Sequence, residues 1–351
     1  MIENQPEVFA QHYAEAGLAE KSVLYWGKAG QRSAARSAMA EATAQLQKGL
    51  DQLRLLPDNP EHQRQELEFW KSLGAVLQTV KGSAAPETGN AYARARALWE
   101  RLGYPSEFFQ IPYGQSIHYA FRGEFDLAQQ LADDLLRLSG QRNDSSGLIL
   151  GHFCSGRNLM SVGRFEPSRS HLEAVLTLYD PVLHRSLVDE AEIRPHVAAR
   201  ASLGIVLFCL GFGDRALAES RAANAEARAL AHPPSLAASL ALGARLISLY
   251  RDNRALAERA DELAAVATTQ RFAHWRAEGK IYRGWATVKN GDVARGISLL
   301  RSGSTAFRDT GAETVTPYHT ALLAAACDVA GQIEEGLTLL DEALSIIERD
   351  R

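Results

Sequence analysis

The chain has 351 residues, a hydrophobic share of 46% and a formal net charge of −4. This hydrophobic share is ample for a continuous core, and the slight negative charge argues against a nucleic-acid scaffold, which would carry a basic stripe. The first thirteen residues lack the basic-then-apolar order of a cleavable signal, and the longest uncharged apolar stretch, 201–213, is too short to span a membrane. We therefore expect a cytoplasmic protein that binds neither nucleic acid nor membranes.

Two small residues, twelve positions apart, recur about every 40 residues along the chain. The pairs are Gly30 and Ala42, Gly74 and Pro86, Ser116 and Ala128, Gly156 and Ser168, Gly204 and Ala216, Gly243 and Ala255, Gly284 and Gly296, and Ala324 and Gly336. Such a period is typical of an array of helical hairpins, because each hairpin buries its apolar face only against its neighbours. Two antiparallel helices that cross closely need small residues at the crossing.

The predicted elements follow from this register. N-terminal helices over residues 1–29 lead into a solenoid over 30–351, with hairpins that start near residues 26, 70, 112, 152, 200, 239, 280 and 320. Glycines that follow seven residues after a first small residue, such as Gly123, Gly163 and Gly291, are expected to close the first helix of each hairpin. No alternating apolar run predicts a strand, so the chain is expected to be all-α.

The second hairpin carries a known repeat signature. Trp70, Leu73, Gly74 and Leu77 match the tetratricopeptide pattern W-x2-L-G-x2-Y, apart from its last residue. The period near 40 exceeds the usual 34, so each helix is expected to be about one turn longer. The predicted fold is a right-handed superhelical solenoid of about eight tetratricopeptide-like hairpins.

Certain positions of each first helix point into the concave surface of a tetratricopeptide array. Here they supply the candidate partner-binding residues Tyr113, Phe153, Arg157, Met160, Phe208, Ile281 and Trp285. Because Arg157 is the charged exception in this set, we expect an apolar groove for an amphipathic helix, an extended apolar peptide or a hydrophobic small molecule. The alternative is that the longer helices bring the first helices together, in which case these side chains are core.

One interval between hairpins is longer than the others. The extra length falls in the segment 179–195, which we expect to be an ordered loop with a short helix. Its residues Tyr179, His184 and Arg185 complete the set of candidate partner-binding residues. Long loops often carry recognition, but they are also where an array tolerates insertions, and the sequence leaves both open.

Several other patterns have a structural explanation. The stretch Gly211–Ala216 satisfies the dinucleotide pattern G-x-G-x-x-A, but the apolar run before it is expected to be a helix, whereas a dinucleotide site needs a strand there. Cys154, Cys209 and Cys327 are expected to be buried thiols, since they lack the close His or Cys of a zinc site. Histidines on or beside first helices have different offsets from the small residues, so we expect them to be scattered and partly buried; they are His118, His152, His196, His274 and His319.

The chain shows no catalytic signature. It contains no Walker A sequence, no H-E-x-x-H and no G-x-S-x-G. We therefore predict no catalytic residues, no metal and no cofactor, and expect that this chain is not itself an enzyme.

Several stretches resemble one group of bacterial regulators. They are His12–Gly17, Tyr25–Trp26, Lys81–Gly82, Ala85–Glu87, Tyr179–Pro181 with His184–Arg185, and Arg283–Ala286. They are similar to the C-terminal tetratricopeptide region of large proteins that carry a class III adenylate/guanylate cyclase domain and an AAA-type (STAND-like) ATPase module; related repeats occur in MalT-type transcriptional activators. The resemblance implies a regulatory and sensing arm. The cyclase and ATPase motifs of those proteins do not occur in this chain.

The last predicted helix keeps apolar Leu344, Ile346 and Ile347 at its end. An exposed apolar end predicts further sequence, self-association or a docked partner. The sequence therefore predicts a non-catalytic interaction and sensor module that binds a protein or peptide, or its own upstream catalytic domains. The alternative is a small-molecule effector-sensing domain that uses the apolar groove or the 179–195 loop.

Overall fold

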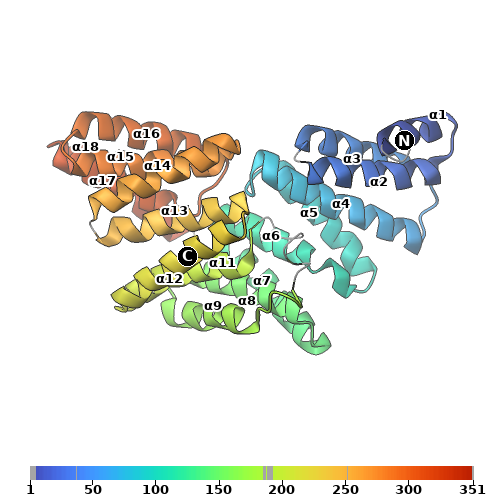
Figure 1. The fold of residues 1–351 in the computed structure, drawn as a ribbon, viewed down its shortest axis with the longest axis horizontal. Coiled ribbons are helices and arrows are strands. Elements are labelled where there is room, and N and C mark those ends of the chain that lie inside the picture. The colour runs from blue at the N-terminus through green and yellow to red at the C-terminus, as the bar shows by residue number, and fades with distance from the viewer. Residues whose placement is uncertain (1–4, 37, 185–186, 188–192, 251, 350–351) are drawn as a thin grey trace. The chain divides into compact units, whose positions relative to one another are not determined.

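The chain folds into successive antiparallel helices joined by short turns (Figure 1). The computed structural model describes residues 5–36, 38–184, 187, 193–250 and 252–349. These residues contain seventeen α-helices and no strand, which confirms the predicted all-α helical-repeat fold. The helices form two units, one that extends to His118 and one that starts at Tyr119.

Unit 1 contains the first hairpins. Its helices are α1 (Pro6–Glu15), α2 (Ala19–Ala35), α3 (Met39–Leu53), α4 (Pro60–Lys81), α5 (Pro86–Arg101) and the first part of α6 (Gln110–Phe121), with a 3₁₀ turn over Ser106–Phe108. Trp26, Leu46 and Phe69 are buried in one core cluster that joins α2, α3 and α4. The apolar face of each hairpin is thus covered by the next hairpin, as the period predicts.

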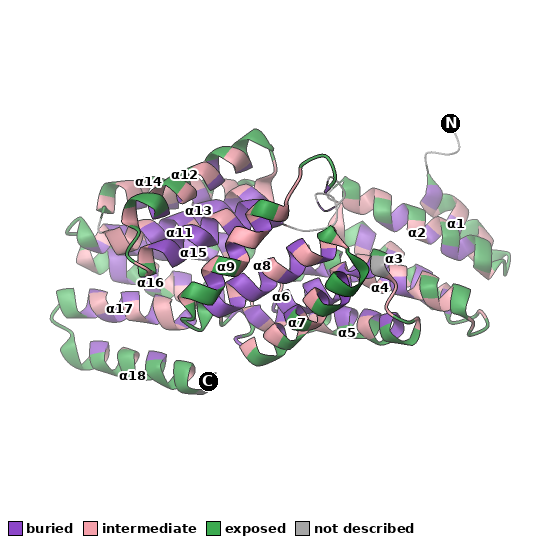
Figure 2. Cartoon of the chain, turned by 90° about the horizontal axis from the view of Figure 1, so that it is seen from below, coloured by how far each residue is buried: buried purple, intermediate pink, exposed green. Residues whose placement is uncertain are grey.

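Unit 2 continues with α7 (Phe125–Arg142), α8 (Ser145–Ser161), α9 (Phe165–Leu178), α11 (Pro195–Cys209), α12 (Gly213–Ala229), α13 (Pro233–Tyr250), α14 (Asn253–Thr269), α15 (Ala273–Lys289), α16 (Val293–Arg308), α17 (Thr316–Val329) and α18 (Ile333–Arg349). The first helices of its complete hairpins are α8, α11, α13, α15 and α17, and their partners are α9, α12, α14, α16 and α18. Buried residues concentrate on these first helices (Figure 2).

The twelve-residue pairs lie where two helices of a hairpin touch. A Cβ atom added to Gly284 would lie 2.8 Å from the backbone nitrogen of Leu300 and 3.0 Å from the carbonyl oxygen of Gly296. In another hairpin, Ser168 Oγ donates a hydrogen bond of 2.6 Å to the carbonyl oxygen of Gly156. The small residues are therefore required by close backbone approach, as the spacing predicts.

The turn glycines close the first helices. Gly123, Gly163, Gly211, Gly291 and Gly331 have φ values of 79°, 77°, 88°, 99° and 73°, a left-handed conformation that glycine adopts without strain. Gly211 lies between the end of α11 and the start of α12, so the run before the dinucleotide-like pattern is helical. The pattern is a hairpin turn, and the strand of a dinucleotide site does not precede it.

The expected burial of the three cysteines is correct for two of them. Cys154 and Cys327 are buried, but Cys209 is exposed. Cys209 is the last residue of α11, where the helix leaves the packed interior for the turn, so the prediction for this residue is wrong. Within the described residues, no helix is both long and apolar enough to cross a membrane.

Candidate functional site

The first helices of unit 2 pack directly against one another. The pairs α11 and α13, α13 and α15, and α15 and α17 are all in contact. As a result, the face that could have lined a groove is largely filled by side chains. Phe153, Met160, Ile281 and Trp285 are 4%, 9%, 0% and 8% exposed, respectively.

The candidate partner-binding residues thus form a buried group and a half-buried group. In unit 1, Tyr113 on α6 is also buried. Arg157, Phe208 and Tyr179 in unit 2 are half-buried and keep part of their surface. Arg185 lies outside the described residues.

Within unit 2, the segment before α17 returns to Phe121, the last residue of α6. The carbonyl oxygen of Phe121 accepts hydrogen bonds from the backbone of Glu313 (2.7 Å) and Thr314 (3.2 Å), just before α17. Its ring contacts the His274 ring, at 5.2 Å between centroids, and lies 4.5 Å from the Arg157 guanidinium. Segments nearly two hundred residues apart in the chain are therefore in direct contact within unit 2.

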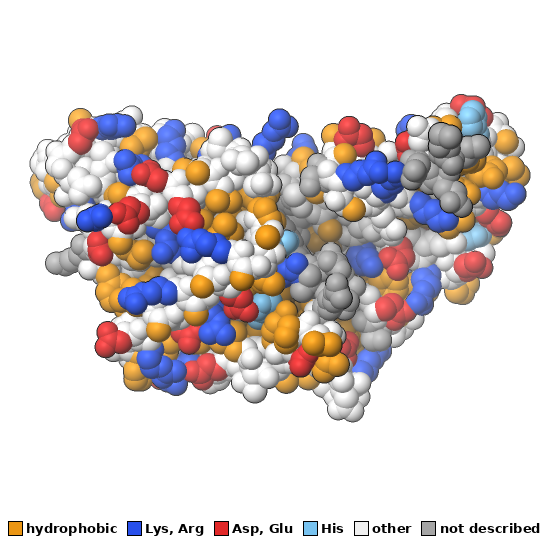
Figure 3. Space-filling view, viewed as in Figure 1, with side chains coloured by type: hydrophobic (Ala, Val, Ile, Leu, Met, Phe, Trp, Pro, Cys, Tyr) orange, Lys and Arg blue, Asp and Glu red, His pale blue; other side chains and the backbone are white. Residues whose placement is uncertain are grey.

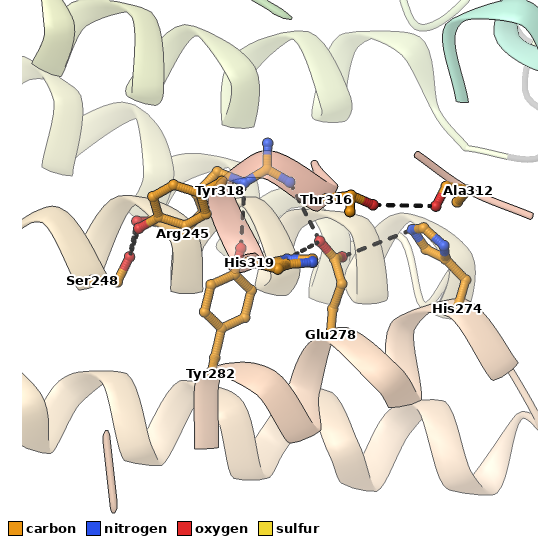
Figure 4. Close-up of polar contacts among 9 residues, drawn as sticks. All are labelled: Arg245, Ser248, His274, Glu278, Tyr282, Ala312, Thr316, Tyr318 and His319. Atoms are coloured by element: carbon orange, nitrogen blue, oxygen red, sulfur yellow. Dashed lines mark hydrogen bonds and ion pairs between the residues drawn. The ribbon is translucent and has the colours of Figure 1, made fainter. Parts of the chain in front are cut away.

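A buried polar cluster joins three consecutive first helices (Figure 4). It consists of Arg245 on α13, His274, Glu278 and Tyr282 on α15, and His319 on α17. Arg245 Nη2 donates to Glu278 Oε1 at 3.3 Å, and Arg245 Nε donates to the Tyr282 hydroxyl at 3.3 Å. Glu278 also lies 3.8 Å from His319 Nε2 and 4.0 Å from His274 Nε2. The Glu278 carboxylate is therefore the centre of the cluster.

Burial controls the protonation of this cluster. Burial, together with the nearby Arg157 and Arg245 charges, lowers the pKa of His274 to about 3. The pKa of His319 is also well below its usual value, mainly because of burial. Burial raises the pKa of Glu278, while Arg245 opposes that rise. At neutral pH the low pKa values leave both histidines uncharged.

The sequence does not predict that the residues of this polar cluster lie together. The different offsets of His274 and His319 from their small residues predict scattered positions, yet both lie beside Glu278, His274 on the same helix, α15, and His319 on α17. A usable signal is Arg245, a charged residue within the otherwise uncharged helix α13. Neither ring nitrogen of His319 has a hydrogen-bond partner among the described residues. Within the same part of the chain, no group of three or more His, Cys, Asp or Glu could hold a metal ion.

The described part of the long loop is anchored to the helices. The Tyr179 ring stacks on the His196 ring, with 3.7 Å between centroids and an angle of 18°. His184 is 2% exposed, with its Nε2 atom 2.8 Å from the Ser145 hydroxyl, and its Nδ1 accepts from the backbone nitrogen of Asp180 at 2.9 Å. These contacts order the start of the loop, and they leave His184 inside the protein rather than on its surface.

An aromatic patch lies at the carboxyl ends of α11 and α13. We define it as Phe208, Phe212 and Tyr250. The rings of Phe208 and Tyr250 are 4.8 Å apart, and the Tyr250 hydroxyl donates to the carbonyl oxygen of Gly213 at 2.6 Å. Phe212 is 41% exposed, and the guanidinium groups of Arg169 and Arg215 lie 5.4 Å and 5.8 Å from its ring. The patch combines partly exposed aromatic rings with flanking positive charge.

The low pKa of His274 predicts that acid destabilises the fold. Between pH 6.5 and about 3, the unfolded chain binds a proton on this residue that the folded chain does not bind, so stability falls as pH falls. We expect the stability advantage of the wild type over His274→Phe to shrink by about 2–3 kcal/mol between pH 7 and pH 4.5. Urea denaturation at several pH values measures this change. His12→Phe, at an exposed histidine, is the control, and a pH-independent difference for His274→Phe would contradict the prediction.

No family model matches the chain. An uncharacterized protein of Rhizobium meliloti (strain 1021) is 25% identical over 341 residues, which cover 95% of this chain and 33% of that protein. The chain therefore spans about a third of the length of this relative.

Solved structures resemble the fold. A Rap protein complexed with competence and sporulation factor has a TM-score of 0.62 at 13% identity, covering 94% of this chain and 99% of the Rap chain. The Rap conjugation gene regulator of the plasmid pLS20, in complex with the Phr* peptide, has a TM-score of 0.63 at 13% identity, covering 93% and 96%. The chain thus shares a tetratricopeptide-like helical-repeat fold with these proteins over more than nine-tenths of its length.

Proposed function

We propose that this chain is a non-catalytic helical-repeat module that binds a protein or peptide partner. The observation that carries the proposal is the aromatic patch, where the rings of Phe208 and Tyr250 are half-buried and contact each other, and Phe212 is exposed beside them. Aromatic side chains and arginines are the residues that most often dominate binding energy at protein interfaces. Arg169 and Arg215 supply positive charge beside Phe212.

The other candidate residues support this surface in the proposal. Arg157 and Tyr179 are half-buried and can contribute to contact, whereas the remaining described candidates hold the first helices in place from beneath; these are Phe153, Met160, His184, Ile281 and Trp285. Tyr113 has the same supporting role in unit 1. The two Rap structures are complexes with a factor and with a peptide, which favours a peptide-like partner.

The finer proposal is that the chain is the regulatory arm of a signalling ATPase or cyclase protein. It rests on the resemblance of its sequence to the tetratricopeptide regions of such regulators, including the Tyr179–Pro181 and Arg283–Ala286 stretches. In this proposal the partner is the catalytic part of that protein or a peptide that regulates it.

A second candidate function is the sensing of a small polar effector. A pocket of about 50 Å³ lies between α16, α17 and α18, lined by Ser304, Phe307, Thr316 and His319, among others. The Ser304 hydroxyl and both His319 nitrogens lack hydrogen-bond partners among the described residues. This volume admits only a few non-hydrogen atoms, so it fits a small polar group better than the hydrophobic molecule considered from the sequence.

A matched pair of substitutions tests the main proposal. The immobilised chain is incubated with an extract of the source cells, and captured proteins are identified by mass spectrometry. We expect Phe212→Ala to lose the captured partner and Leu230→Ala to keep it. These residues are 41% and 39% exposed and lie at opposite ends of the same helix, α12.

The identity of the captured protein decides the finer proposal. A partner with cyclase or ATPase domains supports the regulatory arm. Equal capture by both variants, or no capture, argues against the aromatic patch. A thermal shift with the small-molecule fraction of the same extract, lost in His319→Phe, would favour the effector sensor instead.

A further inference from the structure

The last helix, α18, has a second apolar face that no described part of the chain covers. The residues of this face, the α18 stripe, are Ile333, Leu337, Leu340, Leu344 and Ile347, which are 52%, 58%, 42%, 56% and 40% exposed. Between its first and last residues, no other described helix carries more than one large hydrophobic residue that is at least 40% exposed. Scattered exposed apolar residues are ordinary, but a continuous stripe indicates an interaction surface. Figure 2 shows α18 as a mostly exposed helix beside α17.

The spacing of the stripe is that of a coiled-coil seam. Its residues are separated by four, three, four and three positions, which is the a/d pattern of a heptad repeat. The inner face of α18 is separate from the stripe, because Gly336 and Ala343 are buried against the array. α18 therefore presents one face to its own hairpin and a second face that is suited to another helix.

The preceding hairpin shows how such a face is covered. A shift of 40 residues places the α18 stripe on Val293, Ile297, Leu300, Ser304 and Phe307 of α16. Ile297, Leu300 and Phe307 are 7%, 0% and 1% exposed, and α17 packs on this helix, with the Phe307 and His319 rings 4.8 Å apart. The equivalent face of α16 is thus buried by the next helix of the array.

The flank of the stripe is acidic. With Leu340 and Ile347 at d positions, the e positions are Glu334, Asp341 and Glu348, and all three are exposed. Charges at e positions select the partner of a coiled-coil helix. On α16, the positions that correspond to Asp341 and Glu348 are Arg301 and Arg308, which pair with α18 through Glu335 (2.5 Å) and Glu342 (3.5 Å). At these two positions α16 is therefore basic and α18 is acidic.

We propose that the α18 stripe binds an amphipathic helix of a partner protein that has lysine or arginine along its facing flank. The acidic e positions argue against a second copy of α18. An antiparallel pair would place acidic e positions opposite one another, and a parallel pair would oppose them with Gly336 and Ala343, which carry no charge. The surface is separate from the aromatic patch, so the inference does not depend on the function proposed above.

Two designed peptides test the proposal on the full chain. Both are fluorescein-labelled 21-residue helices with leucine at a and d positions; one carries lysine at e and g, and the other carries glutamate. We expect fluorescence anisotropy to show at least ten-fold tighter binding of the lysine peptide. In Asp341→Lys/Glu348→Lys the preference should reverse, and in Leu337→Glu/Leu344→Glu binding of both peptides should be lost.

Control variants distinguish peptide binding at the α18 stripe from nonspecific hydrophobic binding. Leu24→Glu changes a leucine of similar exposure, 55%, on α2 and should leave binding unchanged, as should Phe212→Ala. Equal binding of both peptides, or binding that survives Leu337→Glu/Leu344→Glu, would overturn the proposal. So would a dimer in multi-angle light scattering that the same double variant converts to a monomer, because a second copy would then occupy the stripe.

Discussion

Replacing Glu278 by alanine is expected to lower the free energy of unfolding by about 3–5 kcal/mol. The Glu278 and Arg245 side chains are only 4% and 17% exposed, so the substitution leaves a buried guanidinium without its carboxylate. A charge in that position has lost its hydration and its ion pair together. Urea denaturation followed by circular dichroism at 222 nm measures the change.

Two further variants test whether the loss of stability comes from the buried ion pair of Arg245 and Glu278. Glu335→Ala removes the partner of Arg301 in an ion pair whose side chains are 49% and 42% exposed, and it should cost no more than about 1 kcal/mol. The double variant Arg245→Met/Glu278→Leu should recover much of the stability, because apolar residues of similar size often replace a buried pair without loss. A loss below about 1 kcal/mol for Glu278→Ala would show that the cluster is hydrated.

Replacing Phe153 by alanine is also expected to cost about 3–5 kcal/mol. The ring is 4% exposed on α8, and its removal leaves a cavity that close-packed neighbours fill only in part. Phe212→Ala removes the same ring from a site that is 41% exposed and should change stability by less than about 1 kcal/mol. Because both residues lie in unit 2, the same unfolding transition reports both changes.

The comparison of Phe153→Ala with Phe212→Ala shows whether the first-helix residues line a binding groove or form the core. A large loss for Phe153→Ala, with Phe212→Ala near the wild type, identifies Phe153 as core and leaves the aromatic patch as the accessible surface. If Phe153→Ala instead remains stable and loses the partner, the first helices form an open groove in solution. The calorimetric unfolding temperature and partner capture of the same two variants separate these outcomes.

The charge pattern of the surface fits an interaction module rather than a nucleic-acid scaffold. Figure 3 shows lysine and arginine side chains intermixed with aspartate and glutamate across the visible face, without a broad basic stripe there. This agrees with the net charge of −4. Mixed charges favour specific pairing over the long-range attraction that nucleic acids require.

The helices and the glycine turns between them could be predicted from the local sequence. Gly284 and Gly296 could be recognised as a contact from their spacing, because only a small residue allows two helix backbones to approach. Gly211 could be recognised as a turn because the residues around it repeat elsewhere at the same offset. The apolar end of α18 was also visible in the sequence, since a helix face is set by local periodicity.

Whether the first-helix side chains are buried or accessible could be learned only from the tertiary structure. The coiling of unit 2 brings Glu313 back to Phe121, and His319 to Glu278, across separations that no local pattern encodes. The curvature of a solenoid is the sum of small rotations between successive hairpins, and side-chain packing sets each rotation. A local repeat fixes which residues face inward, but that accumulated rotation fixes whether the inward face is open to a partner or closed upon itself.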